Sequence, residues 1–244
     1  RASVREAWLR HPELDVIARS ELLKGEARVL DLRDRERALV WVDGRFDRIV
    51  GPGLHALWTV YRDVRVEILD VDEPRFDHPE LRTILAAEKV GGQLAVHVVE
   101  PGHVGVEIRD GEVVGTLGPG AHAFWRNIGT TRVFAVDRRE TMADVAGQEL
   151  MTADKVTLRM NAMVTYRVKD PLLAVGEVED FRQTIYRATQ LALRAVVGGR
   201  ELDALLAEKD AVADELVGLV RTRAAAFGVE IVSVGIRDVI LPGD

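Results

Sequence analysis

The residues best suited to chemistry in this sequence are two histidines at equivalent places in a repeated pattern. His55 and His122 are each followed by alanine and stand shortly before Trp58 and Trp125. A protein zinc site needs three or four His, Cys or carboxylate ligands at short spacing. Neither histidine has such neighbours, so we interpret both as packing or hydrogen-bonding residues beside a turn and predict no metal.

Two glycine-rich loops are the next candidates, because glycine loops can bind phosphate. They are Gly51-Pro52-Gly53 and Gly118-Pro119-Gly120. A phosphate cradle needs successive free backbone N–H groups, usually followed by a helix or a lysine. Proline removes one N–H, and an aromatic cluster follows each loop. The loops therefore predict the ends of strands, and no cofactor is expected.

Nucleophilic and acid–base catalysis find no support either. The chain has no cysteine, and none of its serines, Ser3, Ser20 and Ser233, lies in a Gly-x-Ser-x-Gly elbow. Carboxylate pairs such as Glu177 and Glu179 fit a surface turn. We predict no catalytic residues, and the protein is not expected to be an enzyme.

Composition narrows the class of partner. The chain has 244 residues and a formal net charge of -7. Nucleic-acid binding depends on clustered lysine and arginine that neutralise phosphates, so the charge argues against nucleic acid as a partner. No stretch approaches the ~20 apolar residues that span a bilayer. The lack of cysteine fits a reducing compartment.

The strongest pattern is an internal repeat. Asp43-Gly44 recurs as Asp110-Gly111, and the Gly-Pro-Gly loops, the histidines and the tryptophans recur with it. Every one of these elements is separated from its counterpart by the same distance along the chain, the distance from Gly44 to Gly111, which we call the repeat offset. A gapless match at this many special positions indicates duplication of a unit.

Each copy is predicted to be a β unit. Alternating strands at residues 38–42 and 46–50 flank the first Asp-Gly, which favours the tight turn of a hairpin. A third strand is predicted at residues 64–68, and its counterpart at 131–136. Residues 72–92 hold prolines, glycines and a short helix over 81–89, and they form the predicted boundary between the copies.

The remaining segments mix helices with strands. Residues 2–24 predict one or two amphipathic helices, and residues 154–168 alternate as one long half-buried strand. A helix with the stripe Phe181, Ile185, Ala188, Ala192 and Val196 follows, then a helix over 202–227 capped by Gly228 and a strand over 229–241. The predicted class is α+β with a mixed sheet.

Several segments in order resemble one family. Tyr166-Arg167-Val168-Lys169-Asp170-Pro171 is similar to the "YRV-x-DP" ending of a strand in stomatin-like proteins and slipins. Leu193-Arg194 through Gly198 to Leu202-Asp203-Ala204-Leu205-Leu206 resembles their helix pair. The C-terminal end of the family's domain has a similar pattern in Phe227-Gly228-Val229, Ile236-Arg237-Asp238 and Leu241-Pro242. The resemblance covers residues 102–242.

The resemblance implies the SPFH (band 7) fold, related to prohibitins, and a scaffold that forms homo-oligomeric rings or cages on a membrane. It also implies, as partners, a membrane protease or an NfeD-like membrane protein. A second β unit replaces the hydrophobic hairpin of animal stomatins, as in a bacterial slipin subgroup. That departure argues against direct insertion and for peripheral contact.

We therefore expect a cytoplasmic scaffold, peripheral on the inner face of the cell membrane, with no catalytic activity. The alternative is an adaptor or regulatory module for a membrane protease or its partner. Residues 1–28 are predicted as a helical segment, 29–92 as the first β unit and 93–244 as the SPFH domain. Within that domain, residues 93–170 are the β-rich half and 171–244 the helical half. The N-terminal amphipathic segment, Val4 to Leu23, has a composition that could lie on a bilayer surface, but its basic residues are offset by acids, so we expect it to pack in the core or against a neighbouring subunit.

Overall fold

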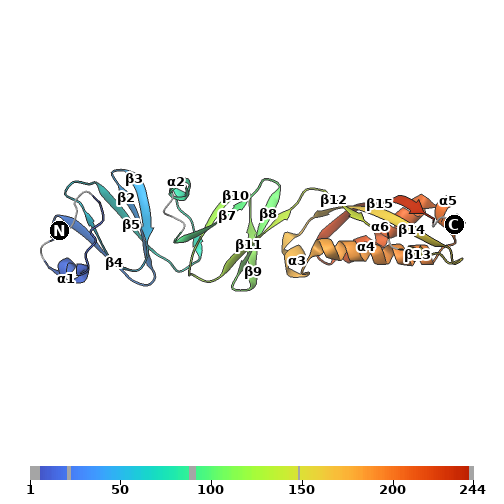
Figure 1. Cartoon of the computed structure of the whole chain (residues 1–244), viewed down its shortest axis with the longest axis horizontal. Helices are drawn as coiled ribbons and strands as arrows, with labels where there is room; N and C mark the ends of the chain where they lie inside the picture. Colours follow the sequence, from blue (N-terminus) through green and yellow to red (C-terminus); the bar gives the residue numbers. More distant parts are fainter. Residues whose placement is uncertain (1–5, 21–22, 88–91, 148, 242–244) are drawn as a thin grey trace. The chain divides into compact units, whose positions relative to one another are not determined.

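A computed structural model of the chain describes residues 6–20, 23–87, 92–147 and 149–241. The chain divides into two compact units (Figure 1). Unit 1 contains residues Arg1–His97 and Ala121–Thr131, and unit 2 contains Val98–Gly120 and Arg132–Asp244. The boundaries predicted from the sequence, at 28/29 and 92/93, stay predictions.

Unit 1 is built from short antiparallel sheets and two short helices. Its elements are α1 (Leu14–Arg19), β1 (Ala27–Leu32), β2 (Glu36–Val42), β3 (Arg45–Val50), β4 (Gly53–Trp58), β5 (Val64–Asp70), β6 (Arg75–Phe76), α2 (Leu81–Leu85), β7 (Leu94–Val99, which ends in unit 2) and β10 (Gly120–Trp125). Strand β1 pairs with β4, β2 lies between β3 and β5, and β10 lies between β6 and β7. Leu39, Trp41, Phe76, Ile84 and Trp125 belong to one buried cluster, which joins the sheet of β2, the sheet of β10 and helix α2 into one core.

The five strands β1 to β5 of the first copy recur as five strands in the second copy. The second set of strands comprises β7, β8 (His103–Arg109), β9 (Glu112–Leu117), β10 and β11 (Thr131–Asp137). Each begins and ends at the repeat offset from its counterpart among β1 to β5, as β11 does from β5. Asp43 and Asp110 adopt φ angles of 52° and 51°, so both hairpin turns use the left-handed conformation that Asp-Gly favours.

The correspondence also includes elements before β1, which the sequence analysis did not find. Trp8 bridges to Leu57, and at the repeat offset Arg75 pairs with Phe124. Helix α2 begins at the repeat offset from the start of α1. The signal in the sequence is His-Pro-Glu-Leu, at residues 11–14 and again at 78–81. Residues 72–92, predicted as a boundary, thus contain counterparts of the N-terminal segment.

The prediction of helices through residues 2–24 is wrong for the described part before α1. The N–H of Leu9 donates to the Ala56 carbonyl at 2.9 Å, and the Trp58 N–H donates to the Ala7 carbonyl at 2.8 Å. The edge of β4 offers these groups, and an extended segment satisfies them where a helix could not. Leu9 and Leu23 are buried against Ala56, as packing on the protein requires. Residues 1–5 and 21–22, with Val4, lie outside the described residues.

Unit 2 combines two sheets with four helices. Its remaining elements are β12 (Thr141–Val145), β13 (Glu149–Met151), β14 (Thr157–Val168), α3 (Pro171–Gly176), α4 (Phe181–Gly198), α5 (Leu202–Ala207), α6 (Lys209–Ala225) and β15 (Val229–Ile240). Strand β8 lies between β9 and β11, while β14 pairs with β12 and β13 along one edge and β15 along the other. Helices α4 and α6 lie along the sheet of β14 and β15 (Figure 1).

The long strand and its helices form the main core of unit 2. Alternate residues of β14 are buried, from Leu158 to Val168, as the sequence predicted. The strand begins at Thr157 and not at 154, because Lys155 has a φ of 68° in a turn closed by the Thr152 side chain. The same cluster includes Ile185 and Leu216 from the helices, and the α+β class is confirmed.

The single helix predicted over 202–227 is divided. Helix α5 ends at Ala207 and α6 begins at Lys209, because Glu208 between them has φ −111° and ψ 39°. Backbone bonds still cross the break, from Glu208 N–H to Ala204 and from Val212 N–H to Glu208, each 3.0 Å long. Neither glycine nor proline marks the position, so the sequence carried no signal for it.

Candidate functional site

Helix α4 provides one wall of the candidate site. It begins at Asp180, whose carboxylate accepts hydrogen bonds from the N–H groups of Arg182 and Gln183 at 2.8 and 3.1 Å. Such an N-cap satisfies donors that a helix end otherwise leaves unpaired. Of the five residues of the predicted stripe, Ile185, Ala192 and Val196 are buried in the core of unit 2, whereas Phe181 and Ala188 are half-buried. This anchoring fixes which residues α4 presents on its other side.

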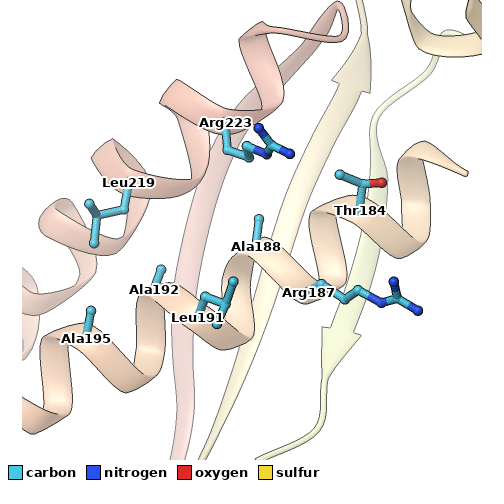
Figure 2. Close-up of a pocket in the computed structure, with 8 residues that line it drawn as sticks. All are labelled: Thr184, Arg187, Ala188, Leu191, Ala192, Ala195, Leu219 and Arg223. Carbon is cyan, nitrogen blue, oxygen red and sulfur yellow. The ribbon is translucent and has the colours of Figure 1, made fainter. Parts of the chain in front are cut away.

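That other side carries a second apolar stripe. Thr184, Ala188, Leu191 and Ala195 recur at intervals of four, three and four residues, which places them on one face of the helix. Together with Leu219 of α6 they line a groove of about 500 Å³ (Figure 2). Leu191 is 66% exposed and Leu219 is 45% exposed, so two large apolar side chains border the groove in contact with solvent.

The groove has a cationic end. Arg187 extends from α4 and Arg223 from α6, both toward the Thr184 end, while Ala195 and Leu219 lie toward the other (Figure 2). Among the described residues neither guanidinium has a hydrogen-bond or ion-pair partner, and no acidic residue lines the groove. The Thr184 hydroxyl donates to the Asp180 carbonyl at 2.8 Å, which engages its proton within the helix.

These properties define what the groove can bind. Its apolar end can take aliphatic side chains, and its arginines can pair with carboxylates that flank them. Among the described residues that line it, none carries an imidazole or a carboxylate, and the only hydroxyl is that of Thr184. The arrangement suits a protein surface that presents leucine-like side chains beside acidic ones.

Histidines at three turns of unit 1, His55 among them, have hydrogen-bond partners within the protein. The Nε2 of His55 lies 3.0 Å from the Gly51 carbonyl and closes the turn before β4. The Nδ1 of His78 accepts a hydrogen bond from the Glu80 N–H at 3.0 Å, and that of His11 accepts one from Glu13 at 3.1 Å. Within the described residues no group of three His, Asp or Glu could hold a metal ion.

The groove was not predicted from the sequence. Ala188 and Ala192 belong to the predicted stripe of α4, yet both line the groove. The signal in the sequence was Leu191, a large apolar residue outside the predicted stripe, together with Leu219 on the next long helix. Only the packing of α4 against α6 shows that these leucines border one groove.

Comparison with known proteins gives matches for the part of the chain that holds the groove. The model of the family described as SPFH domain / Band 7 family matches residues 97–244. A stomatin homolog of Pyrococcus horikoshii is 35% identical over 148 residues, which are 61% of this chain and 55% of that protein. A protein of Archaeoglobus fulgidus is 37% identical over 148 residues, 61% of this chain and 59% of its own.

An animal protein matches over a shorter stretch. Stomatin-like protein 3 of Homo sapiens is 31% identical over 107 residues, 44% of this chain and 37% of that protein. The match therefore spans little more than half the length of the Pyrococcus and Archaeoglobus relatives. No described helix is both long enough and apolar enough to cross a membrane.

Proposed function

The chain belongs to the SPFH domain / Band 7 family, and from that premise we propose that it is a stomatin-like scaffold that assembles with copies of itself at a membrane surface. In this proposal the protein does not catalyse a reaction. The relatives named stomatin homolog and stomatin-like protein 3 support the comparison with stomatins. We propose peripheral contact with the membrane on its cytoplasmic side, and the likeness to stomatins supports this.

The observation that carries the proposal is the open groove between α4 and α6. An apolar groove bordered by exposed leucines lowers the solubility of a protein unless another surface covers it. Another subunit is the occupant that we propose, because unit 2 also carries a surface of complementary chemistry. A contact between two different faces of identical subunits is heterologous, and such contacts close into rings when the rotation permits.

The complementary surface is formed by α3 and the turn after it. Leu172 and Leu173 are each 38% exposed on α3. Glu177 and Glu179 follow on the turn, both are exposed, and neither carboxylate has an ion-pair partner among the described residues. Leucines with flanking carboxylates match an apolar groove with flanking arginines. Charge complementarity of this kind mainly sets the partner and the register of a contact.

The experiment measures mass by light scattering during size exclusion at micromolar concentration. For the full chain we expect a mass several times 27.0 kDa. Leu191→Glu with Leu219→Glu should reduce it toward one subunit. Leu206→Glu, at an exposed leucine of α5 outside the groove, is the matched control and should not change it. A monomeric wild-type chain would overturn the proposal.

Charge exchange tests which surfaces meet. A variant with Arg187→Glu and Arg223→Glu has acidic groups on both surfaces, and a variant with Glu177→Arg and Glu179→Arg has basic groups on both. Each alone should fail to assemble, while an equimolar mixture should assemble, because every groove then meets a surface of opposite charge. If the mixture assembles no better than its components, α3 is not the occupant of the groove.

We infer further that the first β unit arose by duplication of the second, which would place the chain in a slipin subgroup. The repeat offset shared by all five strand pairs supports this. The same recurrence favours a second candidate function, an adaptor for a membrane protease or an NfeD-like protein, since two related units offer two related surfaces. Capture of such a partner by a wild-type chain that stays monomeric would favour the adaptor.

A further inference from the structure

Unit 1 contains a pocket whose polar lining, among the residues that the structure describes, is basic or aromatic. It has a volume of about 370 Å³ and lies between the segment Trp8–Leu14 and strands β3 and β4. Of the described residues, the polar ones that line it are Trp8, Arg10, His11, Arg48 and His55, and none that lines it is acidic. This is unusual in a chain whose formal net charge is -7, so the pocket calls for a specific explanation.

Arg48 is held in place by Trp8 and Asp47. The guanidinium of Arg48 lies 4.8 Å from the centre of the Trp8 ring, and its Nε donates to Asp47 at 2.7 Å. The Trp8 indole N–H donates to the same carboxylate oxygen at 2.8 Å. Asp47 thus orients both side chains from outside the pocket, and the two Nη groups of Arg48 have no hydrogen-bond partner in the described chain.

Two further donors border the same space. Arg10 is exposed and has no side-chain partner among the described residues. The Nδ1 of His11 accepts a hydrogen bond from the Glu13 N–H, so the proton of the neutral ring is on Nε2. The Nε2 of His55 is already hydrogen-bonded to the Gly51 carbonyl, where it closes the turn. Donors from Arg10, His11 and Arg48 therefore remain for a ligand.

The second β unit is an internal control for this arrangement. At the repeat offset from Trp8, Arg10 and Arg48 stand Arg75, Asp77 and Gly115. The same strands, turns and helix form there without the stacked arginine and with an acid in place of Arg10. His11 and His55, by contrast, correspond to His78 and His122. The shared strands, turns and helix therefore form without the two arginines.

We propose that this pocket binds the phosphate group of a phosphate monoester that carries an apolar substituent. Two guanidinium groups and an imidazole N–H from separate segments suit a tetrahedral oxyanion, whereas a planar carboxylate is commonly held bidentately by one arginine. The buried side chains of Leu9, Val50 and Ala56 form an apolar floor for the substituent. The volume exceeds the roughly 30 Å³ share of one water many times over, which leaves room for both parts.

The phosphate could belong to a lipid headgroup or to a small soluble ester, and two binding assays separate these sources. One titrates phenyl phosphate into the full chain by calorimetry. The other measures co-sedimentation with phosphatidylcholine vesicles that contain or lack phosphatidic acid. Binding in either assay, with loss on substitution of the arginines, supports the site and identifies the source. No binding in both assays overturns it.

The variants make the assignment specific. Arg10→Gln with Arg48→Gln should weaken binding at least tenfold, and Arg10→Gln alone, at an exposed position, should weaken it severalfold without affecting the fold. Arg75→Gln, at the place of Trp8 in the second unit, is the matched control and should leave binding unchanged. Binding that is unaffected by the double substitution overturns the proposal. The test is independent of assembly through the groove, because all these residues belong to unit 1.

Discussion

Arg139 binds the carboxylate of Asp137 at two points, with its Nε 2.9 Å from Oδ1 and its Nη2 2.6 Å from Oδ2. The backbone N–H of Arg139 also donates to Oδ1 at 2.9 Å. The side-chain hydrogen bond from Arg139 is the main reason that the pKa of Asp137 is lowered far below its usual value. The pair closes the turn between β11 and β12 of unit 2.

This ion pair predicts a pH dependence of stability. Because the folded state favours the ionised carboxylate, its contribution is complete above the ordinary Asp pKa of about 4 and is lost as the pH falls toward the lowered pKa. Asp137→Asn should cost about 1 kcal/mol at neutral pH, and this cost should shrink as the pH falls below about 4, with part of it still present near pH 2 because the folded-state carboxylate is still ionised there. Urea unfolding at several pH values measures this.

The control for Asp137 is Glu149→Gln, which removes a carboxylate paired with Arg159 at 2.8 Å in the same unit. Both of its side chains are exposed, so solvent screens the pair and the substitution should change the pH dependence much less. Equal effects of the two substitutions across the pH range would show that the Asp137 pair is not special.

Gly228 is predicted to be intolerant of substitution. Its φ is +72°, and a Cβ added there would lie 2.5 Å from the Asp170 carbonyl oxygen. The Gly228 carbonyl also accepts hydrogen bonds from the N–H groups of Lys169 and Asp170, each at 2.9 Å. Left-handed strain and overpacking together should make Gly228→Ala cost about 2–4 kcal/mol of unfolding free energy.

Gly111→Ala is the matched control, because its φ of +91° is also left-handed but no atom lies within 4 Å of an added Cβ. It should cost only about 1 kcal/mol, the strain alone. Denaturant unfolding of both variants measures the difference. If the two costs are equal, the contact with Asp170 has no energetic role.

The sequence predicted best where one face of an element is fully buried. In β14 the alternation of apolar residues ending at Val168 needs only the period of two and a core on one side, and both are visible in the chain. The Asp-Gly turns were equally readable, because few residues adopt the left-handed conformation of Asp43 and Asp110. The local residue pattern was therefore enough to predict these elements.

Prediction failed where tertiary pairing overrides a local pattern. Trp8 and Leu9 have helical spacing with later apolar residues, yet they extend along β4 because its edge groups need partners. The groove could not be predicted because periodicity shows which face of α4 is buried, not what lies beside the other. Leu191 and Leu219 become neighbours of one groove only when α4 and α6 pack.

The N-cap of α4 gives a third prediction. Asp180→Ala removes the acceptor for two backbone N–H groups and should lower the free energy of unfolding by about 1 kcal/mol. Asp180→Ser keeps a capping oxygen and should cost much less. Chemical denaturation compares the two. A serine variant as unstable as the alanine variant would mean that the charge of Asp180, and not its hydrogen bonds, stabilises the helix.

The last prediction separates stability from assembly within α6. Leu216 is fully buried in the core of unit 2, whereas Leu219, one turn away, is 45% exposed on the groove. Leu216→Ala should cost about 2–5 kcal/mol because it leaves a cavity, and Leu219→Ala should stay within about 0.5 kcal/mol of wild type. Thermal unfolding and light scattering are measured on both. We expect Leu219→Ala to keep its free energy of unfolding but to form assemblies of lower mass, since it removes only the contact with another subunit. A Leu219→Ala variant that assembles like the wild type would show that the groove is not where subunits meet.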